Sequence, residues 1–238
     1  KSAATRPEVL TLVPTVEGEP WLQQNGEHWR LYEFVTDSIC FDAATPETFR
    51  ESGLAFGRFQ RQLADFDAST LTETIPHFHD TPHRYAALHA AAAADTFGRA
   101  GTAARELDFA FAREALAGEL TGLLDTGNLP LRVTHNDTKL NNVLFDRETR
   151  RAVCVIDLDT VMPGLAACDY GHSIRFGAST AAEDARDLSK VAFSLPLFEP
   201  STAGFLSACA GRLTPADTAP PPLGATIMTP ESRDPFLR

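Results

Sequence analysis

The sequence is poor in basic residues, and no run of apolar residues is long enough to cross a membrane. Its 238 residues include 21 lysines and arginines against 32 aspartates and glutamates, which gives a formal net charge of −11. Such a chain repels polyanions overall, although a local basic pocket for phosphate is compatible with the acidic excess. A membrane span needs about 18 consecutive apolar residues, and no stretch approaches this length. We therefore expect neither a nucleic-acid nor a membrane partner.

Cysteine is also scarce, and its spacing argues against two common uses. No two cysteines form a C-x-x-C pair, and all lie in otherwise apolar stretches: Cys40, Cys154, Cys168 and Cys209. In a chain of this size they indicate buried thiols in a reduced compartment, not a disulfide framework. Residues 1–7 are polar and lack the apolar core of a secretory signal. These observations predict a cytoplasmic protein.

Ordinary composition, with 43% hydrophobic and 22% charged residues, excludes a disordered or fibrous chain. Residues of high β-propensity come first, in three stretches: 9–13, then Trp21-Leu22 after a turn at 17–20, and 29–35 after an Asn-Gly turn. Three short strands return after Pro130. The expected strands are 9–13, 29–35, 131–134, 142–146 and 152–156. Apolar residues at helical spacing, with capping residues before them, fill most of the remainder. The expected helices begin at Thr45, Thr81, near Phe109 (one helix as far as Gly127), after Asp169 and at Thr214.

One short segment concentrates the residues of chemical interest. It reads Thr134-His135-Asn136-Asp137-Thr138-Lys139-Leu140-Asn141-Asn142, and Asp157-Leu158-Asp159 follows fifteen residues later. Phosphoryl transfer needs a carboxylate beside the acceptor hydroxyl and oxygen ligands for Mg²⁺. Asp137 suits the first role, whereas Asn142 and Asp157 suit the second. Lys139 can balance charge on the transferred group, and His135 is expected to support the loop by hydrogen bonds.

These residues resemble the catalytic and metal loops of the aminoglycoside phosphotransferase and choline kinase family, which has a protein-kinase-like fold. Within that family they look most like the N-acetylhexosamine 1-kinases. The similar segments are 78–82, 135–146, 155–164 and 169–175, and the likeness extends over roughly residues 8–215. The resemblance implies that Asp137 is the catalytic base, that Asn142 and Asp157 bind Mg²⁺, and that ATP is the phosphate donor. It also implies that the hinge Tyr32-Glu33-Phe34-Val35 lies beside adenine.

The chain departs from that family at both ends. A complete kinase-like enzyme has an N-terminal lobe with a phosphate-covering loop and a strand lysine. Here only about thirty residues precede the hinge, and Lys1 is the only lysine before Lys139. We therefore expect an α+β fold with a remnant of the N-terminal lobe over residues 1–36, a mostly helical catalytic lobe with small β-hairpins over 37–215, and an irregular tail over 216–238. Either an upstream segment is missing, or the protein is a remnant.

Several residues allow more than one interpretation. Asp157 does not begin an EF-hand calcium loop, because Val161, Met162 and Cys168 occupy the positions that such a loop reserves for an acid or amide, glycine and glutamate. Asp159 is either a further metal ligand or a residue that orients the loop. Asp169 is either a functional acid or a helix cap, and the cap is favoured.

The three histidines His77, His79 and His83 have a spacing that could hold zinc. A loop beside the acceptor pocket and a plain solvated loop are the competing interpretations of that segment.

The expected function is therefore Mg²⁺- and ATP-dependent phosphorylation of a small molecule. The resemblance favours the anomeric hydroxyl of an N-acetylhexosamine, an amino sugar. Choline, homoserine or an aminoglycoside is the alternative acceptor, and a non-catalytic nucleotide-binding remnant is the alternative from another class. Because positioning supplies most of the catalysis in this chemistry, we expect the chain as given to transfer phosphate poorly. The sequence does not predict an oligomeric state.

Overall fold

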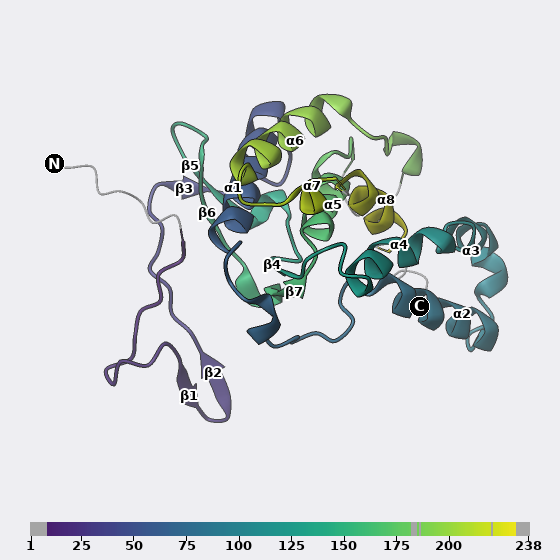
Figure 1. The fold of residues 1–238 in the computed structure, drawn as a ribbon, viewed down its shortest axis with the longest axis horizontal. Helices are drawn as coiled ribbons and strands as arrows, with labels where there is room; N and C mark the ends of the chain where they lie inside the picture. Colours follow the sequence, from purple (N-terminus) through teal and green to yellow (C-terminus); the bar gives the residue numbers. More distant parts are fainter. Residues whose placement is uncertain (1–8, 182–184, 186, 220, 232–238) are drawn as a thin grey trace.

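A computed structural model describes residues 9–181, 185, 187–219 and 221–231. Figure 1 shows a mostly helical body from which the N-terminal segment extends to one side. Within the described residues, no helix is long and apolar enough to span a membrane.

The N-terminal segment forms a hairpin of β1 (Leu22–Gln24) and β2 (Glu27–Trp29). Asn25 and Gly26 both have positive φ, 54° and 82°, as a tight two-residue hairpin turn requires. The strands predicted over 9–13 and 29–35 are wrong in extent: among the described residues they meet, beyond Trp29, in an isolated bridge between Leu12 and Tyr32. Backbone bonds from Val13 N to Leu31 O at 2.8 Å and from Glu33 N to Thr11 O at 2.9 Å flank that bridge. Short strands result because this segment forms a separate ribbon, whose two strands have no third strand beside them.

The largest helix contact joins α1 (Pro46–Gln62) to α6 (Leu195–Cys209). As predicted, α1 begins after Thr45, whose side chain and that of Thr48 form a reciprocal cap. Its aromatic face is core, and Phe49 is fully buried.

The predicted helix from Phe109 to Gly127 is two helices, α3 (Ala104–Phe111) and α4 (Glu114–Asp125). Between them, bonds from Arg113 N to Ala110 O and from Leu116 N to Arg113 O span only three residues, so the α-helical pattern is interrupted. Both helices pack near α2 (Thr81–Ala94), which Asp80, not Thr81, caps.

Two small sheets border the site. One has the order β3 (Ser38–Ile39), β5 (Val143–Asp146), β6 (Ala152–Val155), and the other pairs β4 (Arg132–Thr134) with β7 (Met162–Gly164). The hairpin predicted from 142–146 and 152–156 is therefore confirmed. Short 3₁₀ turns complete the connections: η1 Ala68–Thr70, η2 Ala100–Ala103, η3 Leu140–Asn142, η4 Leu158–Thr160 and η5 Leu188–Lys190.

The C-terminal part is more regular than predicted. Helix α7 (Pro215–Thr218) begins at Thr214 as expected, but α8 (Pro221–Glu231) occupies residues predicted to be irregular. A proline in the first turn of a helix lacks only an N–H that would be unpaired there, so the proline run starts α8 instead of preventing it. Helix α8 packs on α5 (Ala166–Gly177), and Gly224 lets the two backbones approach closely.

The four cysteines are free thiols. Three are buried as predicted, whereas Cys40 is exposed, because it lies in the chain leading to α1 instead of on a core strand. Burial raises the pKa of Cys154 to about 11.

Candidate active site

The loop from β4 to η3 gathers three of the predicted site residues. Asp137 lies at its centre, with the Lys139 Nζ 3.2 Å from Oδ1. The Asn142 amide nitrogen donates to Oδ2 at 3.0 Å and to the Asp137 carbonyl at 2.8 Å. Asp137 is only partly buried, so its carboxylate is held in place and still accessible.

The Asn142 amide fits a metal ligand. Its nitrogen must face Asp137, because only an N–H₂ group can donate to two oxygens there, and this leaves the amide oxygen for another partner. The Ile156 N–H donates to the Asn142 carbonyl at 2.9 Å, so Asp157 follows a residue paired directly with Asn142. Asp157 is exposed and adopts a left-handed backbone (φ 61°) without capping the 3₁₀ turn after it. An amide oxygen and a free carboxylate are the hard donors that Mg²⁺ prefers.

The Asp159 carboxylate pairs with an arginine of the N-terminal segment. Its Oδ1 accepts from Arg30 Nη2 at 2.6 Å, and its side chain is 73% exposed. Asp159 thus joins the N-terminal segment to the loop that carries Asp157, and its role as a metal ligand or as a residue that orients the loop stays a prediction.

The hinge predicted over Tyr32–Val35 follows directly after this contact. The Tyr32 ring lies 5.9 Å from the Arg30 guanidinium, Val35 is buried, and Phe34 is exposed. The predicted hinge therefore begins two residues after Arg30, which forms the ion pair with Asp159. Its role beside adenine stays a prediction.

His135 supports the loop from inside, as predicted. Its ring is fully buried between Phe56 and Phe59, with centroid distances of 5.5 and 5.8 Å. Nε2 lies 2.9 Å from the Ile156 carbonyl, and Nδ1 accepts the Asp137 N–H at 3.3 Å. These partners fix the tautomer with hydrogen on Nε2, so His135 joins the Asp137 loop to the end of β6.

The prediction that Asp169 is a helix cap is wrong: the residue lies inside the first turn of α5, whose N-cap is Leu165, and its carboxylate faces the Asp137 loop instead. One carboxylate oxygen accepts Gln60 Nε2 at 2.7 Å and the His135 N–H at 2.9 Å, and the other accepts the Asn136 N–H at 2.7 Å. Burial raises the pKa of the Asp169 carboxyl, and the bonds it accepts oppose part of that rise. Asn136 is in the left-handed region (φ 64°), so Asp169 holds a strained backbone just before Asp137. The sequence contained one indication of this role: Asp169 is a single acidic residue within the otherwise apolar stretch 165–170.

His172 is a site residue that sequence reasoning missed. From α5, its Nε2 comes within 3.9 Å of Asp137 Oδ1, and its buried Nδ1 has no hydrogen-bond partner among the described residues. Burial holds the pKa of His172 well below its usual range, and the neighbouring His79 and Arg175 lower it further. A neutral imidazole therefore faces the carboxylate of Asp137.

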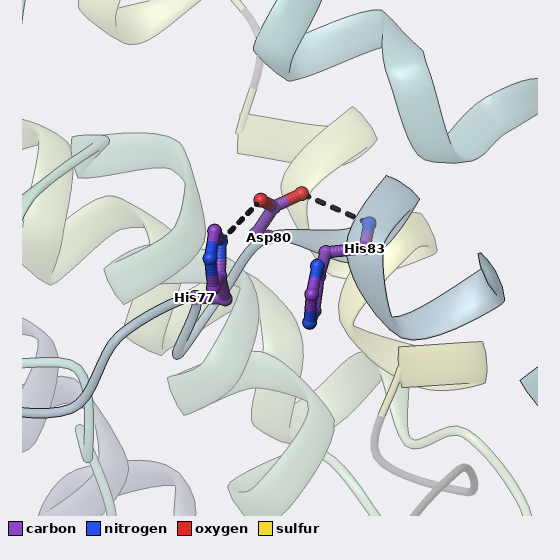
Figure 2. A group of neighbouring side chains, drawn as sticks. All are labelled: His77, Asp80 and His83. Carbon is purple, nitrogen blue, oxygen red and sulfur yellow. Dashed lines mark hydrogen bonds and ion pairs between the residues drawn. The ribbon is translucent and has the colours of Figure 1, made fainter. Parts of the chain in front are cut away.

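The three histidines before and within α2 separate into two groups. His79 Nε2 lies 3.1 Å from the Asn136 carbonyl, so this ring contacts the Asp137 loop. His77 and His83 instead stack on each other, with ring centroids 4.1 Å apart, on either side of Asp80 (Figure 2). The spacing in the sequence suggested a zinc site of His77, His79 and His83. In the structure Asp80 lies beside His77 and His83, whereas His79 points to the Asp137 loop.

Comparison with known proteins finds a matching family and several similar solved structures. The profile of a family described as "Phosphotransferase enzyme family" matches residues 6–200. Among solved structures, the chain is similar to an amicoumacin kinase in complex with AMP-PNP, Ca²⁺ and Ami, with a TM-score of 0.61 and 11% identity over 97% of this chain and 65% of that one. It is also similar to a spectinomycin phosphotransferase in complex with ADP and spectinomycin (TM-score 0.53, 15% identity, 96% and 66% coverage).

A microcompartment-associated aminopropanol kinase is a third similar structure (TM-score 0.50, 18% identity, 93% and 65% coverage). The chain thus spans 65–66%, slightly less than two thirds, of these three structures. The likeness confirms the predicted α+β, protein-kinase-like fold.

Proposed function

The chain belongs to the phosphotransferase enzyme family, and from this premise we propose that it acts in transferring the γ-phosphoryl group of ATP to a hydroxyl of a small molecule. The observation that carries the proposal is the partly exposed Asp137 carboxylate, which contacts Lys139 and Asn142 in the loop between β4 and η3. Such a carboxylate is what the acceptor hydroxyl needs beside it, and similar kinases bind ATP analogues or ADP.

In this proposal each residue has a distinct task. Asp137 accepts the proton of the acceptor hydroxyl as that oxygen bonds to phosphorus, and the ADP leaving group takes the electrons of the broken P–O bond. Lys139, now paired with Asp137, is close enough to balance charge on the transferred group. Asn142 and Asp157 would hold Mg²⁺, which when bound neutralises charge on the phosphates.

For the acceptor we propose the anomeric hydroxyl of an N-acetylhexosamine. The support is the resemblance of segments 78–82 and 169–175 to N-acetylhexosamine 1-kinases, together with where these segments lie. They contribute His79 and His172, whose rings are 6.1 Å apart and which adjoin the Asp137 loop. Choline, homoserine and aminoglycosides are the competing acceptors.

The test is phosphate transfer from Mg-ATP by the purified chain to a panel of these four acceptors. We expect slow turnover, well below the ~10 s⁻¹ typical of enzymes, with an N-acetylhexosamine. Asp137→Asn and Asp157→Ala should each lower it by 100-fold or more, because one removes the base and the other a metal ligand. Asp125→Asn, at the exposed end of α4 and outside the site, is the matched control and should retain most of the activity. Turnover that survives in Asp137→Asn would disprove the proposed mechanism, and turnover only with another acceptor would disprove the proposed substrate.

A non-catalytic nucleotide-binding protein is the second candidate. The observation in its favour is that the sequence has no lysine between Lys1 and Lys139 that could grip the α- and β-phosphates. Binding of Mg-ATP in calorimetry, without transfer to any acceptor, would favour this candidate over the kinase.

A further inference from the structure

A second group of ligand-type side chains lies at the start of α2, outside the phosphate-transfer site. His77 comes from the preceding loop, Asp80 caps the helix, and His83 is in its first turn (Figure 2). One ligand atom from each residue lies within 4.8 Å of the other two. His77 Nδ1 is already 2.9 Å from Asp80 Oδ2.

These separations are close to those of a closed metal site. With bonds of about 2.0–2.2 Å and tetrahedral angles, two ligands of Zn²⁺ are about 3.4 Å apart. Since all three ligand atoms here lie within 4.8 Å of one another, no separation exceeds the tetrahedral value by more than about 1.4 Å. Both histidines are exposed, so rotation of their side chains can close the difference without movement of the backbone.

The local charge also suits a cation. The Asp80 carboxylate faces both histidines: one oxygen lies 2.9 Å from His77 Nδ1, and the other accepts the His83 N–H at 3.0 Å. Glu73 adds a second carboxylate, whose Oε1 accepts the His77 N–H at 3.0 Å. Arg84 opposes these charges, but its guanidinium donates to the Phe78 carbonyl.

We propose that His77, Asp80 and His83 form a site for a divalent transition metal of the Zn²⁺ class, with water as the fourth ligand. Two imidazoles and one carboxylate are a donor set for Zn²⁺ and its neighbours, whereas Mg²⁺ prefers oxygen. The site is therefore chemically distinct from the one at Asn142 and Asp157, and it does not rest on the proposed function.

Metal binding here has a structural consequence for the Asp137 loop. His79 lies between the ligands in sequence and contacts the Asn136 carbonyl. An ion that fixes His77 and His83 also fixes the segment that carries His79, so we expect it to restrict the loop just before Asp137.

The experiment is a Zn²⁺ titration of the tag-free chain against a chromophoric chelator, with excess Mg²⁺ present to occupy the oxygen-ligand site. A Cys40→Ser background removes the exposed thiol as a competing ligand. We expect one equivalent of Zn²⁺ to bind, with affinity at least 10-fold weaker in His77→Gln and His83→Gln. Asp80→Asn should weaken binding similarly while keeping the helix cap, because Asn is as good a cap as Asp.

His89→Gln is the matched control, since His89 is an exposed histidine of the same helix that pairs with Glu114. It should bind Zn²⁺ like the parent chain. Equal affinity in all variants, or loss only in His89→Gln, would overturn the site. Because the readout is binding and needs neither ATP nor acceptor, an inactive chain leaves the result interpretable.

Discussion

Buried polar side chains are concentrated around the residues proposed for catalysis. Thr134, His135, Thr138 and Asp169 are all almost completely buried, and each has hydrogen-bond partners within the loop or in the elements that hold it. A buried polar group without partners costs about 1–3 kcal/mol, so such a network is stable only as a complete set. This network holds the backbone on both sides of Asp137 in place, although Asp137 itself lies on a loop.

Asp169→Asn tests this network. An amide nitrogen cannot accept the backbone N–H of His135 or Asn136, so at least one buried donor loses its partner. We expect the free energy of unfolding to fall by about 1–3 kcal/mol, measured in urea, and kcat to fall as well because the loop loses its anchor. Asp125→Asn, at the exposed end of α4, should change stability by less than about 0.5 kcal/mol. An Asp169→Asn chain as stable as this control would show that the network is not needed.

At the scale of elements, glycines determine how closely the helices approach. A Cβ added at Gly53 of α1 would lie 2.2 Å from the Ser201 carbonyl oxygen of α6, and one added at Gly204 would lie 2.3 Å from the Arg50 carbonyl oxygen. Real Cβ contacts do not reach such distances, and backbone atoms cannot rotate away. The packing of α1 on α6 therefore requires small residues at these positions.

Gly53→Ala should consequently destabilise the chain despite the better helix propensity of alanine. We expect a loss of about 1–3 kcal/mol from the clash, measured by urea unfolding. Gly118→Ala is the control, because a Cβ added there, on α4, meets nothing within 4 Å. It should be neutral or stabilising by up to about 1 kcal/mol. The packing argument fails if the two substitutions have effects of the same sign.

The short helix α7 is attached to β4 by a buried ion pair. The Asp217 carboxylate accepts two hydrogen bonds from Arg132, from Nε at 3.2 Å and from Nη2 at 2.8 Å. It accepts a further bond from Thr214 Oγ1 at 2.7 Å. Burial alone raises the pKa of Asp217, but these bonds outweigh it and lower the pKa below its usual range. The pair therefore stabilises the folded chain above the unfolded pKa of about 3.9, and this contribution is lost as the pH falls through the folded value.

Asp217→Asn should be destabilising at pH 7 and progressively less so, relative to the parent chain, below about pH 4. Urea unfolding at pH 7, 5, 4 and 3 measures the difference. Asp65→Asn, which breaks the exposed pair with Arg212, should have little effect at any of these pH values. A difference for Asp217→Asn that is the same at pH 3 and pH 7 would contradict the assignment.

At the scale of the whole molecule, the N-terminal segment exposes large apolar side chains. They include Val16 at 98%, Phe34 at 87%, Leu31 at 64% and Trp29 at 56% exposure. Figure 1 shows the hairpin of β1 and β2 extending away from the helical body, which this part of the chain contacts through the Arg30–Asp159 pair. Clustered exposed apolar surface and the free edges of a two-stranded ribbon both favour association.

The chain should therefore self-associate at micromolar concentrations. Replacing Trp29 and Leu31 by serine should shift the population toward monomer in size-exclusion chromatography with light scattering. Phe97→Ser is the control, because Phe97 is an exposed aromatic that contacts Arg99 and lies between α2 and α3, which Figure 1 shows on the opposite side of the molecule from the hairpin. A parent chain that is monomeric throughout the concentration range would refute this prediction.

The sequence by itself determined the local features. The Thr45 cap, the Asn25-Gly26 turn and the β5–β6 hairpin follow from short-range backbone and capping preferences that neighbouring residues decide. The proximity of Asp137, Lys139 and Asn142 is likewise local, because the last follows the first by only five positions in the sequence. Short separations leave the chain few alternative geometries.

Only the tertiary structure decided which distant residues join that segment. Asp169 on α5 accepts hydrogen bonds from the backbone of the loop, and His172 faces Asp137. Arg30 forms an ion pair with Asp159. Asp80 joins His77 and His83 because a helix begins there, which the histidine spacing does not encode. Helix α8 forms on α5 although its sequence has no clear period, since packing against Gly171 and Ala167 supplies what propensity does not. Contacts between distant segments depend on how whole elements pack, so a pattern of neighbouring residues cannot specify them.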